Sequence, residues 1–80
     1  MSNYKVQYHD AHSILIVNSK GIIRKLRTPF RVRCCKAIGA YREGVYVYVE
    51  EVGSTDEDLL MYHIGDVPYY HNYFRVVADF

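Results

Sequence analysis

The feature that most constrains this fold is the stretch EGVYVYVEEV at residues 43–52. Valine and tyrosine alternate along it, which is the pattern of a β-strand and is unfavourable in a helix. Both faces are largely apolar, so the strand is either covered on both sides or presents Tyr46 and Tyr48 as a contact surface. The alternation slips at Glu50 and Glu51, which predicts a bulge or a bend from one sheet to the next. We therefore predict the central strand of a small sheet here.

Length and composition indicate a single ordered domain. The chain has 80 residues, half of them hydrophobic, and nine are tyrosine. No apolar run reaches the roughly 18 residues of a membrane span, and no signal peptide is recognisable. We expect a cytoplasmic protein with no membrane association. The adjacent Cys34 and Cys35 are expected to remain free thiols, because neighbouring cysteines cannot form a relaxed disulfide.

The net charge of +1 conceals a strong division along the chain. Residues 1–42 carry nine of the ten Lys and Arg side chains but one acid, Asp10, whereas residues 43–80 carry eight acids and one cation, Arg75. Such asymmetry indicates either a polyanion-binding half or two halves that pair with each other.

Further strands are expected on both sides of residues 43–52. They cover residues 4–8, 13–17, 22–26, 31–34 and 75–77. The first should lie at a sheet edge, and the next two should form a hairpin whose loop ends at Gly21. In residues 31–34 we expect Val32 and Cys34 to point inward and the arginines outward. Residues 69–74, YYHNYF, fit a single 3-10 turn better than a strand.

Residues 53–64 are compatible with two structures. Ser54 and Glu57 have the spacing of a capping box, which predicts a helix with Leu60 and Ile64 on one face. Alternatively, GSTDED is a hairpin tip and residues 60–64 form a strand with Leu60, Tyr62 and Ile64 on one face. We favour the strand, because it keeps neighbouring strands antiparallel with a short loop.

From residue 32 to residue 77 the order is basic strand, glycine loop, strong strand, acidic hairpin, strand, aromatic turn and short last strand. This order, with the segments VRCCKAIG, GVYVYVEEV, LLMYHIG and YYHNYF, resembles the SH3-like small β-barrel and small bacterial and phage proteins of that kind. The resemblance implies a mostly β, antiparallel SH3-like barrel over residues 31–80 with an added N-terminal β-hairpin over residues 1–30. The chain lacks Trp, so the resemblance does not extend to recognition of Pro-rich ligands.

Two surfaces are candidates for binding. The first is rich in tyrosine, which suits interfaces where one end of the side chain is wet. Its residues are Tyr46, Tyr48, Tyr69, Tyr70 and Tyr73. The second is the basic stretch 20–36, which contains no acid and could neutralise phosphates. Its residues are Lys20, Arg24, Lys25, Arg27, Arg31 and Arg33. Phe30, Tyr41, Tyr46 and Tyr48 could supply stacking surfaces for bases.

Neither a metal site nor an active site is expected. His9, Asp10 and His12, or His63 with His71, lack the ligand spacing of a structural zinc site. The chain also lacks a nucleophile elbow, a phosphate loop and a recognisable carboxylate pair. We therefore predict a non-enzymatic, cofactor-free module, monomeric or homodimeric through an N-terminal edge strand, that binds a protein partner through the tyrosine surface. The alternative is nucleic-acid binding through the basic stretch.

Overall fold

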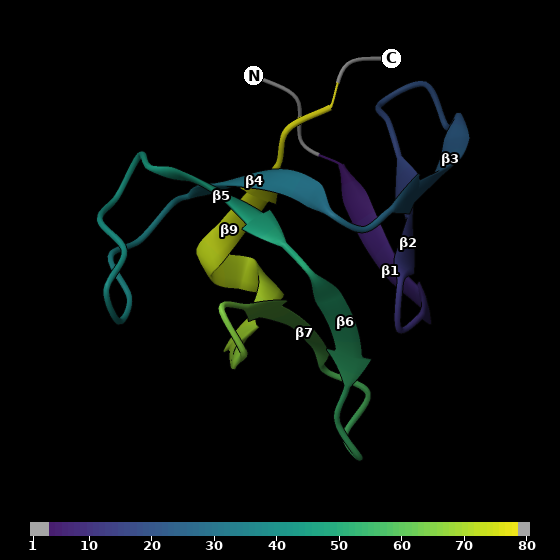
Figure 1. Cartoon of the computed structure of the whole chain (residues 1–80). Helices are drawn as coiled ribbons and strands as arrows, with labels where there is room; N and C mark the ends of the chain where they lie inside the picture. Colours follow the sequence, from purple (N-terminus) through teal and green to yellow (C-terminus); the bar gives the residue numbers. More distant parts are fainter. Residues whose placement is uncertain (1–3, 79–80) are drawn as a thin grey trace.

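The computed structural model describes residues 4–78, which form nine strands and one 3-10 turn. In chain order these are β1 (Lys5–Asp10), β2 (Ser13–Val17), β3 (Ile23–Arg27), β4 (Phe30–Cys34), β5 (Tyr46–Val49), β6 (Glu51–Ser54), β7 (Leu60–Ile64), β8 (Val67–Tyr70), η1 (His71–Tyr73) and β9 (Phe74–Val76). The strands make three antiparallel sheets in the orders β1-β2-β3, β5-β4-β9 and β6-β7-β8 (Figure 1). The predicted mostly β, antiparallel class is confirmed, although none of these sheets closes into a barrel.

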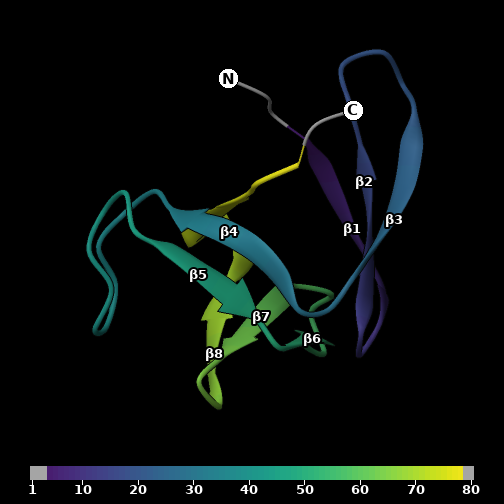
Figure 2. The ribbon, with the colours of Figure 1, turned by 45° about the horizontal axis from the view of Figure 1, so that its top comes forward.

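The N-terminal sheet follows the sequence pattern closely. β2 pairs with β3 as a hairpin, and β1 lies at the edge, as predicted (Figure 2). In the loop, Gly21 N donates to Asn18 O at 3.0 Å, and Gly21 has a φ of 81°. The Asn18 Oδ1 atom accepts from the backbone N–H groups of Lys20 and Ile22, each at 2.9 Å. Asn18 and Gly21 therefore fix this turn. The asparagine side chain accepts hydrogen bonds from the turn backbone, and glycine adopts a positive φ at no steric cost.

The valine–tyrosine stretch bends between two sheets. β5 pairs with β4 and β6 pairs with β7, and Glu50 lies between them outside either strand. The predicted passage from one sheet to the next is confirmed. The predicted central position is wrong, because β5 and β6 are edge strands and β4 and β7 are the central ones. A strong strand propensity does not decide how many neighbours a strand acquires.

The strand interpretation of residues 60–64 is confirmed. Leu60, Tyr62 and Ile64 are buried, and the residues between them are half-buried. The preceding tip turns at Thr55, whose Oγ1 atom accepts from the backbone of Glu57 at 3.2 Å and Leu59 at 3.1 Å.

The 3-10 turn near the C-terminus is shorter than predicted. It covers His71–Tyr73, whereas Tyr69 and Tyr70 belong to strand β8. A two-residue turn makes this possible, because Gly65 and Asp66 both have positive φ and join β7 directly to β8. β8 is an edge strand, so the missing N–H of Pro68 is tolerated there.

All three sheets contribute to one core. Its residues are Ile14, Ile16, Phe30, Val32, Cys34, Val49, Val52, Leu60, Tyr62, Ile64, Phe74 and Val76. The N-terminal hairpin therefore supplies two of the most buried side chains, Ile14 and Ile16. Cys34 is buried and Cys35 half-buried, and both are free thiols, as predicted.

Asp10 stabilises the turn after β1 and makes stability dependent on pH. Its Oδ1 atom accepts from the His12 N–H and the Ser13 hydroxyl, both at 2.8 Å. These hydrogen bonds lower the pKa of Asp10 to about 2. Because this pKa lies below its unfolded value of 3.8, the stabilisation is present above pH 3.8 and is lost as the pH falls through 2.

We expect Asp10→Asn to weaken this acid dependence. The melting temperature of the native chain should fall more between pH 4 and pH 2 than that of the variant, which keeps an acceptor oxygen but cannot titrate. Thermal unfolding followed by circular dichroism at several pH values checks this. Equal falls in both proteins would show that Asp10 does not contribute to acid unfolding.

Candidate ligand-binding face

The outer surface of sheet β5-β4-β9 is rich in arginine and tyrosine. In β4, Phe30, Val32 and Cys34 are buried, so Arg31 and Arg33 project to the other side. β5 buries Val49 and exposes Tyr46 and Tyr48 by 57% and 58%. In β9, Arg75 is exposed between two buried neighbours. The five exposed residues are called the Arg–Tyr face: Arg31, Arg33, Tyr46, Tyr48 and Arg75.

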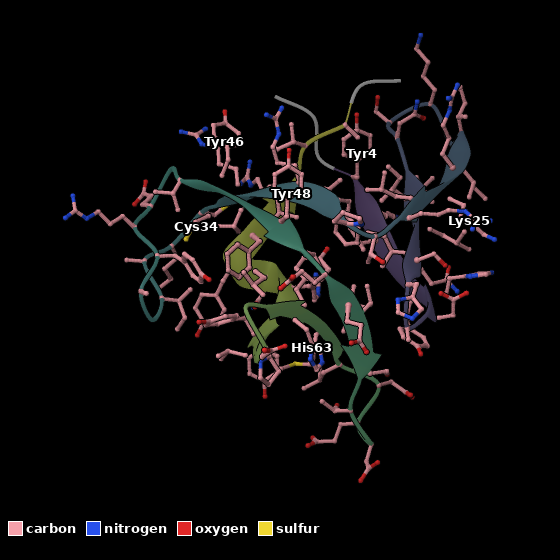
Figure 3. The ribbon with its side chains drawn as sticks, in the orientation of Figure 1. Tyr4, Lys25, Cys34, Tyr46, Tyr48 and His63 are labelled. Carbon is pink, nitrogen blue, oxygen red and sulfur yellow. The ribbon has the colours of Figure 1, made fainter. Side chains whose placement is uncertain are left out.

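The register brings these side chains together. Arg31 lies opposite Tyr48 and Arg33 opposite Tyr46, while Arg33 also lies opposite Arg75 on its other side. The guanidinium carbon of Arg31 is 5.0 Å from the centre of the Tyr46 ring, within cation–π range. Figure 3 shows Tyr46 and Tyr48 pointing away from the core on the same side of β5.

Among residues 4–78, neither Arg31 nor Arg33 forms an ion pair within 4 Å with an acid. One acid, Glu43, does lie near Arg33. It lines a hollow of about 210 Å³ together with Arg33, Cys35 and Arg75. The acidic hairpin at residues 54–58 is therefore not the electrostatic partner of these two arginines.

The basic stretch predicted as one surface is divided between two sheets. Lys20 lies in the loop before β3, and Arg24, Lys25 and Arg27 lie on β3 itself. Figure 3 places Lys25 on the β3 side of the molecule, away from Tyr46. Only Arg31 and Arg33 of the predicted cations lie on the face that carries Tyr46 and Tyr48.

The five predicted tyrosines are likewise not brought into one surface. Tyr69 packs edge-on against Tyr41 and Phe74, with ring centres 5.7 and 5.8 Å apart. Tyr73 is also half-buried against the core, and Tyr70 is exposed on β8. Tyr46 and Tyr48 therefore form a pair of their own.

Two of the aromatic residues considered for base stacking are not accessible on the Arg–Tyr face. Phe30 is only 3% exposed and packs edge-on against Tyr62 at 5.5 Å, so its proposed stacking role is wrong. Tyr41 is half-buried between Tyr69 and Phe74. β4 starts at Phe30, and its period of two places this ring on the core side.

Arg75 was missed as a site residue. It is the one cation of the acidic half of the sequence, and nothing local links it to Arg33. Its position between Phe74 and Val76 signals an outward side chain, but the pairing of β9 with β4 is a long-range contact.

We expect Gly39→Ala to destabilise the fold around Tyr69. Gly39 has a φ of 58°, and a Cβ there would lie 3.0 Å from Tyr69 Oη. Gly21→Ala is the matched control, because its φ is 81° but nothing lies within 4 Å of the added atom. Both variants should lose roughly 1 kcal/mol through backbone strain, and Gly39→Ala should lose more. Urea unfolding measures the difference, and equal losses would contradict the predicted crowding.

The histidines and acids of the described residues do not gather into a metal site. Within residues 4–78, no three His, Cys, Asp or Glu side chains come close enough together to hold a metal ion. His9 Nδ1 instead lies 2.9 Å from Ser13 Oγ and 3.2 Å from Asp10 Oδ2. No helix in the described part of the chain has the length and apolar character needed to span a bilayer.

Comparison with known proteins found no matching family model, no similar curated protein and no similar solved structure.

Proposed function

We propose that this chain is a non-enzymatic binding module that binds single-stranded nucleic acid on the Arg–Tyr face. The supporting observation is the cross-strand arrangement of Arg31 and Arg33 opposite Tyr48 and Tyr46. Exposed tyrosine rings offer stacking platforms to bases, and neighbouring cations contact the phosphates. A sheet face suits this ligand because splayed bases need an open surface rather than an enclosed cavity.

We also propose that residues 31–80 have an SH3-like architecture, although the sheets are not closed. The pairings that favour it are the return of β9 to β4, the division of one long stretch into β5 and β6, and the β6-β7-β8 meander. The 3-10 turn directly before β9 is a further point of similarity. In this proposal β1, β2 and β3 are an added N-terminal unit that shares the core.

A protein partner is the second candidate ligand. Tyr and Arg are the residues most enriched at the centres of protein interfaces, and Tyr46 and Tyr48 are both more than half exposed. Such a partner would bury the same tyrosines. It would differ from nucleic acid in a much weaker dependence of affinity on salt.

Fluorescence anisotropy of a labelled single-stranded oligonucleotide, titrated at several salt concentrations, tests the proposed function. We expect affinity to fall steeply with salt, and Arg31→Ala with Arg33→Ala to reduce the log–log slope by about 1.4, since each phosphate contact to a single strand contributes about 0.7.

The matched control is Lys25→Ala with Arg27→Ala, which removes the same charge from exposed positions of β3. The control should leave the slope nearly unchanged. No binding at low salt, or equal losses in both double variants, would count against the Arg–Tyr face as a nucleic-acid site. The second candidate would then be favoured if the chain captures a protein partner, if this binding changes little with salt, and if it is lost when Tyr46 is replaced.

A further inference from the structure

A groove runs along the open edge of β1. Within residues 4–78, β1 pairs with β2 on one side and with no strand on the other. Two hollows of about 530 and 370 Å³ lie along the open side, and Val6 and His71 line both. Tyr4, Lys5 and Val6 line the first, and Val6, Gln7 and Tyr8 the second. Because successive residues of a strand point to opposite faces, a groove lined by consecutive residues follows the strand edge.

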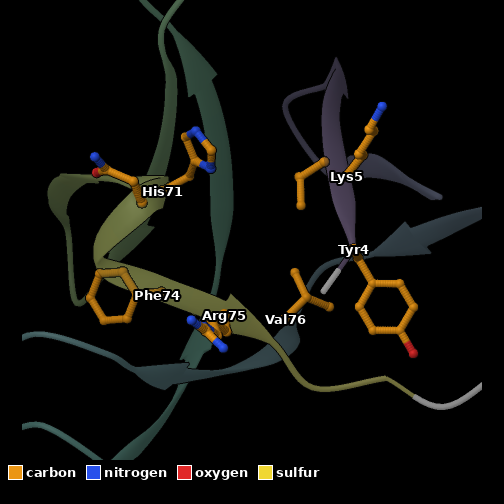
Figure 4. Close-up of a pocket in the computed structure, with 8 residues that line it drawn as sticks. Tyr4, Lys5, His71, Phe74, Arg75 and Val76 are labelled. Atoms are coloured by element: carbon orange, nitrogen blue, oxygen red, sulfur yellow. The ribbon is translucent and has the colours of Figure 1, made fainter. Parts of the chain in front are cut away.

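The opposite wall comes from the C-terminal part of the chain. η1 and β9 line the larger hollow, and the end of the β6–β7 turn lines the smaller one. Figure 4 shows Tyr4 and Lys5 on one side and His71, Phe74 and Arg75 on the other. Just after the end of β1, β6 lies against the chain, because Val52 N donates to Ala11 O at 2.8 Å. The groove is thus bounded at the Ala11 end, and at its other end the Tyr4 hydroxyl donates to Ala78 O at 2.7 Å.

The floor of the groove is apolar. Phe74, Val76 and Leu60 line it and are at most 7% exposed. His71 is half-buried, and burial lowers its pKa, so its ring is neutral near pH 7. Apolar pockets beside an open backbone edge are what an added strand requires, since alternate side chains enter the pockets while its backbone pairs with the edge.

The charges along the groove are unequal. Of the residues between 4 and 78 that line the larger hollow, Lys5 and Arg75 are cations and none is an acid. The smaller hollow, in contrast, is lined by an acid, Asp58. A ligand that fits both hollows would therefore carry negative charge at its Lys5 end.

We propose that this groove binds an extended peptide by strand addition to β1, with acidic side chains of the peptide beside Lys5. An exposed strand edge is a template for pairing with another chain, and here the adjoining apolar hollows and the cationic end restrict which chain fits. This binding site shares Arg75 with the Arg–Tyr face, but the other four residues of that face line neither hollow.

Anisotropy of a dye-labelled hexapeptide of alternating glutamate and valine tests the proposal. We expect binding that is lost when lysine replaces glutamate. Two further peptides carry N-methyl groups on either the odd or the even residues. Strand addition uses one edge of the peptide only, so one methylated peptide should bind and the other should not. If both bind as well as the parent, or if the parent does not bind at millimolar concentration, the proposal is wrong.

Variants locate the site and separate it from nucleic-acid binding. Lys5→Glu should weaken the glutamate–valine peptide about fivefold, whereas Lys25→Glu, an equal charge change on β3, should leave it unchanged. The Arg31→Ala, Arg33→Ala double variant should bind the peptide normally. Loss of peptide binding in that double variant, with Lys5→Glu having no effect, would assign the peptide to the Arg–Tyr face and overturn the inference.

Discussion

Replacement of Ile14 by alanine is expected to lower the free energy of unfolding by about 2–5 kcal/mol. Ile14 is completely buried in β2 and lies opposite Tyr8 of β1 and Leu26 of β3. Its side chain belongs to the same core as residues of the other two sheets. Since small domains have about 5–15 kcal/mol of stability in total, this loss should leave the variant easily unfolded.

Leu15→Ala is the matched control for that variant. Leu15 is the next residue of the same strand but lies on its other face and is half-buried. Urea unfolding of both variants, monitored by far-ultraviolet circular dichroism, measures the two losses. A loss at Ile14 no larger than that at Leu15 would mean that the N-terminal sheet does not share the core on which the remaining strands depend.

Replacement of Tyr46 and Tyr48 together by alanine is expected to weaken single-stranded oligonucleotide binding by at least about tenfold. Stacking of a base on an aromatic side chain contributes about 1–3 kcal/mol, and both rings are more than half exposed on the Arg–Tyr face. The fold should survive, because exposed substitutions usually change stability by no more than about 0.5 kcal/mol. Anisotropy titrations at one fixed salt concentration measure the loss.

The matched control replaces the same two tyrosines by phenylalanine. Phenylalanine keeps the stacking ring and loses the hydroxyl, so affinity should remain within about threefold of the native chain. If the phenylalanine variant loses as much affinity as the alanine variant, the tyrosines act through their hydroxyl groups and stacking is not the mechanism. If neither loses affinity, the face does not contact the bases.

Local patterns were sufficient to predict which side chains of a strand face the core. The alternation in β4 separates Val32 and Cys34 from Arg31 and Arg33, and the structure has the same division. The bend after Val49 also follows from a local signal, the two successive glutamates. Such features depend on neighbouring residues only, and the two-residue period of a strand is strict.

Long-range pairing could not be predicted in the same way. The place of β5 at an edge depends on β9 returning to the far side of β4, which no residue near Tyr46 indicates. The Arg–Tyr face therefore combines members of two predicted surfaces with Arg75, which belonged to neither. Tyr69 and Tyr70 were assigned to the 3-10 turn because residues 69–74 are too polar and aromatic for an ordinary strand. The turn at Gly65 and Asp66 instead pairs them with β7, at an edge of the sheet where Pro68 is accommodated.

The most direct test of the Arg–Tyr face is a titration of the ¹⁵N-labelled chain with a single-stranded oligonucleotide, monitored by backbone amide chemical shifts. Shift changes should concentrate on β4, β5 and β9, around Arg31, Arg33, Tyr46, Tyr48 and Arg75. β3, which carries Lys25 and Arg27, should remain unchanged at moderate salt. Shift changes centred on β3, or no shift changes at all, would contradict the proposed nucleic-acid interface.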